Sequence, residues 1–138
     1  MPFPRHIRRR EFTYRIKKEW GQLYWFDFGA PSSGQRPFAE QHPALIINNP
    51  GITLPGTVLI IPVTGAEHRR PGYEFHVEIT KLECPELDKD SVAKVDQIYC
   101  VEDREMPDQY FIGKLELDTV RRIYAKLLKV LNFDMLLK

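Results

Sequence analysis

The chain lacks the residue arrangements that mark several common classes of catalytic site. It has no glycine-rich phosphate-binding loop, no nucleophile elbow and no cluster of metal ligands. Ser32 and Ser33 lie in a loop segment without an evident acid–base partner, so we interpret them as turn residues. The carboxylates between Glu83 and Asp90 indicate a solvated loop and not a paired acid–base site.

The two cysteines argue against two further kinds of site. Cys84 and Cys100 are sixteen positions apart, with no Cys-x-x-Cys pair and no histidine at a zinc-finger spacing. A metal site and a disulfide framework are therefore not indicated. We expect two partly buried thiols, no metal and no cofactor.

Short β-strands are the main elements that the sequence predicts. The aromatic run at 22–28 and the apolar runs at 43–48 and 57–63 are typical of strands. Pro62 cannot donate a ladder hydrogen bond, which predicts an edge position or an irregular end for its strand. Further strands are expected at residues 73–79, 91–95 and 97–101, while 110–113 is too short to assign.

The C-terminal part changes to a helical period. Apolar residues between Val120 and Leu131 recur at i, i+3, i+4 and i+7, which predicts an amphipathic helix with Asp118 as its N-cap. We expect its apolar face to pack on the sheet, leaving residues 133–136 as possible extra contact surface. Residues 29–41 and 65–72 are predicted loops, the first long enough to suggest a function. The fold class is mainly β, a small antiparallel barrel with one C-terminal helix.

Charge is distributed unevenly along this chain of 138 residues, whose net charge is +1. Residues 1–18 carry a local charge of +6, and the remainder carries −5. We therefore expect a basic, flexible arm at 1–18 and a single domain at 19–138. The arm could contact phosphates or simply be a solvated terminus, and both alternatives stay open. No apolar run is long enough to span a membrane and no secretory signal is evident, so we expect a soluble, cytoplasmic protein.

The order of several short motifs carries the analysis further. Residues 20–31 (WGQLYWFDFGAP), 40–47 (EQHPALII) and 60–64 (IIPVT) resemble the first three strands of the MazF/PemK toxins. The later segments 76–79, 90–92, 96–98 and 112–115 match the order of that family's remaining elements. The resemblance covers about residues 20 to 131, and the joint order is more specific than any single motif.

This resemblance implies a fold, an activity and partners. It implies an SH3-like barrel, a homodimer, cleavage of single-stranded RNA without a metal, and an antitoxin peptide that occupies the RNA groove. The family relies on an arginine before the proline of the second strand and on a threonine at the end of the third. Thr64 matches the threonine, but His42 stands in place of the arginine.

This substitution changes the chemistry available to the site. Arginine offers a permanent charge and a planar fork for phosphate, whereas histidine exchanges a proton near neutral pH. His42 could act as the general acid or base with Thr64 binding the phosphate, another arginine could supply the charge, or the site could be inactive. The sequence offers five candidates for RNA binding or charge stabilisation: Arg36, Glu40, Gln41, Arg69 and Arg70. Glu40 either orients His42 or faces solvent.

Two functions from different classes remain open at this point. The first is an endoribonuclease toxin with His42 and Thr64 in its groove. The second is a catalytically inactive relative that keeps the barrel as an RNA- or protein-binding module. Without the resemblance, His42 would be interpreted as an ordinary residue at the start of a strand.

Overall fold

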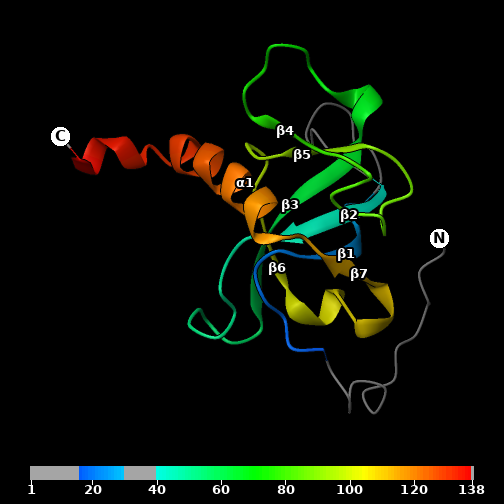
Figure 1. The fold of residues 1–138 in the computed structure, drawn as a ribbon. Coiled ribbons are helices and arrows are strands. Elements are labelled where there is room, and N and C mark those ends of the chain that lie inside the picture. The colour runs from blue at the N-terminus through cyan, green and yellow to red at the C-terminus, as the bar shows by residue number, and fades with distance from the viewer. Residues whose placement is uncertain (1–15, 30–39, 138) are drawn as a thin grey trace.

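The computed structural model describes residues 16–29 and 40–137 (Figure 1). The strands are β1 (Gln22–Asp27), β2 (Gln41–Ile46), β3 (Thr57–Gly65), β4 (His76–Ile79), β5 (Ser91–Lys94), β6 (Tyr99–Glu102) and β7 (Phe111–Lys114). The helix is α1 (Leu117–Val130), and the 3₁₀ turns are η2 (Ala66–His68), η3 (Asp103–Glu105), η4 (Asp108–Tyr110) and η5 (Phe133–Leu137). Most of the predicted basic arm, together with Ser32, Ser33 and Arg36, lies outside the described residues.

The strands form one curled antiparallel sheet with the helix packed on it. The strand order is β4-β5-β3-β2-β1-β7, and β6 pairs with the first half of β3. The long strand β3 crosses the whole sheet and joins its two halves (Figure 1). This half-barrel with one C-terminal helix confirms the predicted mainly β class. The described residues contain no helix that is long and apolar enough to cross a membrane.

Of the two alternatives expected for Pro62, the edge position is wrong, because β3 is a central strand. Pro62 pairs with Ala44 on the β2 side. On the other side, β6 pairs with β3 as far as Ile60 and β5 pairs with it from Val63 onward. Pro62 therefore lies where β3 changes partners, and its missing N–H interrupts neither ladder.

Side-chain alternation along the strands produces an apolar cluster on each face of the sheet. On β1, Leu23 joins the cluster under the helix and Tyr24 joins the opposite cluster. The same alternation repeats on β2, where Leu45 faces the helix and Ile46 the other side. All four are buried, so the sheet is covered on both faces and its register is strongly specified.

The N-cap of helix α1 lies two residues before the predicted one. Glu116 has the extended N-cap conformation, and Asp118 lies inside the first turn, where a negative charge favours the helix dipole. The expectation of an Asp118 cap is therefore wrong. The helix packs on the sheet through Val120, Ile123 and Leu127, as its period predicts.

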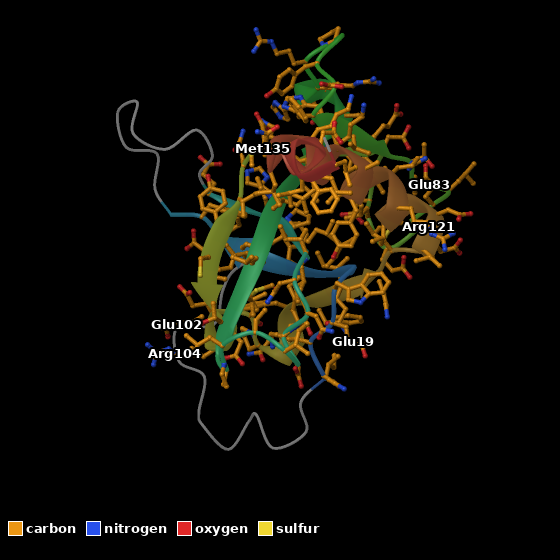
Figure 2. The ribbon with its side chains drawn as sticks, turned by 90° about the vertical axis from the view of Figure 1, so that its left-hand side faces the viewer. Glu19, Glu83, Glu102, Arg104, Arg121 and Met135 are labelled. Atoms are coloured by element: carbon orange, nitrogen blue, oxygen red, sulfur yellow. The ribbon has the colours of Figure 1, made fainter. Side chains whose placement is uncertain are left out.

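Two polar contacts fix the orientation of α1 on the sheet. The Tyr124 hydroxyl donates a 2.6 Å hydrogen bond to the Ile47 carbonyl, just after β2. Near the start of the helix, Glu83 lies beside the first turns (Figure 2) and accepts a 2.7 Å hydrogen bond from the Thr119 hydroxyl. Figure 1 shows the last turns and η5 extending away from the sheet.

The remaining strand expectations are confirmed in type but shortened. The predicted strand at 73–79 is reduced to β4, because the backbone before it forms turns, in which the His76 N–H donates to the Tyr73 carbonyl at 3.3 Å. The unassigned segment 110–113 contains most of β7, which pairs with β1. The expectation of two partly buried thiols is wrong, because Cys84 is fully buried and Cys100 is exposed; both are free thiols.

Candidate functional site

A cavity of about 210 Å³ opens where β2 begins and β3 ends, beside the segment that precedes β5. Its lining includes Gln41, His42 and Thr64, and we call it the His42 cavity. Trp25 and Ile112 supply part of its apolar surface. The structure thus brings together three of the residues that the sequence singled out.

The sheet pairing explains why His42 and Thr64 border one cavity. Strand β2 pairs with β3 through Ala44–Pro62, Leu45–Ile61 and Ile46–Ile60. His42 and Thr64 each lie two residues beyond the Ala44–Pro62 pair, where β2 stays paired with β1 and β3 pairs with β5. Both side chains line the cavity at this end of the ladder, so one bound group can contact both.

The two side chains differ in how firmly they are held. Thr64 is only 6% exposed and sits on β3 between β2 and its β5 partner Val92. His42 is half-buried and pairs with Phe26 on the β1 side. Neighbouring Gln41 is also half-buried and pairs with Asp27. A buried hydroxyl on a central strand offers a fixed donor, and the half-buried imidazole beside it faces the solvent-connected cavity.

Glu40 has a structural task at the entry to β2. It adopts a φ of 71°, a region that non-glycine residues seldom occupy. Its N–H donates to the Gly29 carbonyl at 2.6 Å, and its carbonyl accepts from the Phe28 N–H at 2.8 Å. These bonds tie together the two ends of the segment 30–39. The exposed Glu40 side chain is not part of the cavity lining.

Arg69 and Arg70 lie elsewhere on the structure. Arg69 lines a second, more open cavity of about 580 Å³ between β4 and α1, and its guanidinium pairs with Glu78 at 3.1 Å. The Arg70 N–H donates to Nδ1 of His76 at 3.0 Å. Burial, followed by the nearby charge of Lys94, lowers the pKa of His76. Neither arginine contributes to the lining of the His42 cavity.

The wall opposite His42 consists of residues that the sequence did not select. It comes from η2 and from the segment before β5, and its ionisable members are Glu67, His68, Glu86, Asp88 and Lys89. The Lys89 ammonium donates to Glu67, and this hydrogen bond is the main cause of the lowered pKa of that carboxyl. The Ala66 N–H donates to the Asp90 carbonyl at 2.9 Å and holds the two segments together.

No signal in the sequence marks this wall. The acidic run at 83–90 has the composition of a solvated loop, and two of its carboxylates do face solvent at the cavity rim. Only the antiparallel pairing of β3 with β5 brings this run beside Thr64. Across residues 16–29 and 40–137, no group of three His, Cys, Asp or Glu side chains is placed to hold a metal ion.

Solved structures with the same fold support this description of the chain. MazF (Form-I) from Deinococcus radiodurans aligns with a TM-score of 0.63 at 22% identity, covering 83% of this chain and 96% of that chain. A MazE–MazF complex (Form-III) from the same organism aligns at 0.60 with 24% identity and the same coverage. An endoribonuclease from a mycobacterial species aligns at 0.61 with 19% identity, covering 86% of this chain and 95% of that one.

Comparison with models of protein families shows to which family the chain belongs. The search of curated proteins found no significant match. The model of the PemK-like, MazF-like toxins matches residues 19–131, which is most of the chain. The protein therefore belongs to the PemK-like, MazF-like toxins of type II toxin–antitoxin systems, a family of endoribonucleases.

Proposed function

We propose that this protein is a metal-independent endoribonuclease toxin that cleaves single-stranded RNA in the His42 cavity. The observation that carries the proposal is the placement of His42 and Thr64 on adjacent strands at one cavity. Family membership supplies the class of activity, and the cavity supplies residues that can perform it.

The reaction needs three tasks at one phosphodiester. A base removes the proton of the ribose 2′-hydroxyl, whose oxygen then attacks phosphorus and forms a 2′,3′-cyclic phosphate. An acid protonates the 5′-oxygen as its bond to phosphorus breaks. A donor stabilises the additional negative charge on the phosphoryl oxygens in the transition state.

His42 and Thr64 can divide these tasks between them. An imidazole exchanges protons near neutral pH, so His42 serves as the general acid or base. The Thr64 hydroxyl donates a hydrogen bond to a phosphoryl oxygen from a buried and therefore preorganised position. Gln41 beside His42 can bind the RNA with its side-chain amide.

The shape and chemistry of the cavity favour an unpaired strand. Trp25 presents part of a half-buried aromatic ring to the cavity, and aromatic rings stack on unstacked bases of single-stranded RNA. A rigid duplex cannot turn one of its bases onto this ring. We therefore expect single-stranded RNA to be cut and duplex RNA to stay intact.

The positive charge that the family arginine would place at the phosphate must come from another group or be absent from this site. Arg36 lies outside the described residues, and Arg69 and Arg70 lie outside the cavity lining. Three carboxylates in the lining, those of Glu67, Glu86 and Asp88, oppose the approach of a polyanion. This acidic rim favours the second candidate, a catalytically inactive relative that binds a protein partner.

Incubation with RNA separates the two candidates. Purified protein is mixed with single-stranded RNA of mixed sequence in the presence of a chelator. We expect the wild type to cleave, and His42→Ala and Thr64→Ala to lose activity. Cys100→Ala, on the exposed strand β6 outside the cavity, is the matched control and should cleave normally. Intact RNA at high wild-type concentration rejects the enzyme and leaves the binding module.

We further propose two protein partners. The Deinococcus radiodurans toxin forms a complex with MazE, which supports a cognate antitoxin for this chain. A homodimer is supported by the apolar side chains exposed at the end of α1 and on η5. These are Leu128, Leu131, Phe133, Met135, Leu136 and Leu137. Light scattering of the purified protein measures its mass in solution. A homodimer should have twice the chain mass of 16.2 kDa.

A further inference from the structure

The His42 cavity has one lysine in its described lining and no arginine. Three carboxylates and two histidines complete the ionisable lining, so a bound phosphate would meet more negative than positive charge. Proteins hold RNA phosphates mainly with Lys and Arg side chains. Lys89 is therefore the residue in the described part of the cavity that can offset this imbalance.

The backbone holds Lys89 close to the strand that carries Thr64. Ser91 pairs with Gly65 in the β3–β5 ladder, directly after Thr64. The Ser91 hydroxyl donates a 2.9 Å hydrogen bond to the Lys89 carbonyl. Lys89 therefore lies two residues before the start of β5, where this hydrogen bond fixes its backbone. Its long side chain reaches the cavity from the wall opposite His42.

In the free protein, Glu67 holds the ammonium group of Lys89. The Lys89 Nζ donates to Oε1 of Glu67 at 2.5 Å. The Glu67 carboxylate lies directly against Gly65, where any side chain would collide with it. Both partners remain more than half exposed, and exposed ion pairs contribute little to stability. An RNA phosphate can therefore replace Glu67 as the partner of Lys89.

We infer that Lys89 binds an RNA phosphate in the His42 cavity, and that Glu67 competes with the RNA for it. This inference rests on the proposed function. It assigns to Lys89 the positive charge that the family arginine would supply. As a point charge without a planar fork, Lys89 binds and positions the phosphate, while proton transfer stays with His42.

Binding of a non-cleavable RNA tests the inference without relying on catalysis. The probe is a 2′-O-methyl oligonucleotide, which lacks the attacking hydroxyl. We expect Lys89→Ala to weaken binding by about tenfold. We also expect a shallower salt dependence. The slope of the logarithm of the binding constant against the logarithm of the salt concentration should become less negative by about 0.7, the value for one lost phosphate contact with a single strand. Lys81→Ala, an exposed lysine of the same segment outside the cavity, should bind as the wild type does.

Glu67 provides the second arm of this experiment. Glu67→Gln should bind the oligonucleotide more tightly, because it frees Lys89. In a Lys89→Ala background the same change should tighten binding less, because it then removes only the direct repulsion between Glu67 and the RNA. Circular dichroism melting identifies misfolded variants, and Lys89→Gln, which keeps most of the side-chain stem, replaces Lys89→Ala if that variant melts early.

The outcomes separate this inference from the proposed function. If the wild type cleaves and binds RNA but Lys89→Ala and Lys89→Gln keep its affinity and salt slope, the assignment of Lys89 is wrong and the function stands. If the wild type neither binds nor cleaves RNA, both are rejected. An effect of Glu67→Gln that is equally large with and without Lys89 rejects the competition.

Discussion

His42 and Thr64 line the same cavity from neighbouring strands, each two residues beyond the Ala44–Pro62 pair that ends the β2–β3 ladder. Residues that act on one bound group do not contribute independently. We therefore predict that His42→Ala and Thr64→Val each lower the cleavage rate by about 10²-fold or more. The double variant should be no slower than the slower single variant. Single-turnover rates check this prediction, and strictly multiplicative losses would show that the two residues contribute independently.

Replacing His42 by arginine tests its role in proton transfer. Arginine stays protonated at all accessible pH values, whereas histidine titrates near neutrality. We predict that His42→Arg keeps RNA binding but loses the limb of the pH–rate profile between about pH 5 and 8 that the wild type owes to histidine. Cleavage rates measured across this range check the prediction. If the wild type and His42→Arg have profiles of the same shape, His42 does not transfer the proton.

Glu83 connects the segment after β4 to helix α1, beside its first turns (Figure 2). Burial opposes its ionisation, but hydrogen bonds from Thr119 and Arg122 outweigh burial and lower its pKa. Because the folded pKa is lowered, the ionised carboxylate stabilises the protein above the unfolded value of about 4.3. That stabilisation is lost as pH falls through the lower folded value.

Accordingly, Glu83→Gln should lower the free energy of unfolding by about 1 kcal/mol at pH 7. The difference from the wild type should shrink below about pH 4, as Glu83 becomes protonated. Urea unfolding at several pH values measures both. Glu78→Gln, which removes the exposed partner of Arg69, is the control and should change the free energy by less than about 0.5 kcal/mol. A Glu83 effect that is constant down to pH 2 would exclude an electrostatic origin.

Alanine substitutions at two apolar positions on opposite faces of α1 test how the helix packs. Ile123 is fully buried against the sheet, whereas Leu128 is 43% exposed. Ile123→Ala should lower the free energy of unfolding by about 2–5 kcal/mol, because it leaves a cavity in the core. Leu128→Ala should change it by about 0.5 kcal/mol or less in the monomer. Equal losses from chemical denaturation would mean that the helix packs differently.

Much of the fold was predictable because local patterns decide it. The aromatic run at 22–28 and the apolar runs at 43–48 and 57–63 each became a strand, and the helical period at 120–131 became α1. The position of Pro62 was not predictable, because it depends on where β3 exchanges β6 for β5. That exchange is a property of the whole sheet and leaves no local mark.

The site was predictable only in part, for a related reason. Motif order identified His42 and Thr64, and both line one cavity. Arg69 was a candidate because of its charge and its place in a loop, but Glu78 on β4 draws its guanidinium toward the second cavity. Lys89 was overlooked because its acidic neighbours resemble a solvated loop. Its approach to Thr64 arises from β3–β5 pairing between segments distant in sequence.

The chemical identity of the RNA ends tests the central claim most directly. Single-stranded RNA is cleaved by the wild type in chelator, and the fragments are analysed by mass spectrometry. Attack by the 2′-hydroxyl predicts 2′,3′-cyclic phosphate and 5′-hydroxyl ends, and no cleavage at a site that carries a 2′-deoxy sugar. Fragments with 5′-phosphate ends, cleavage at the 2′-deoxy site, or RNA that stays intact would contradict the account.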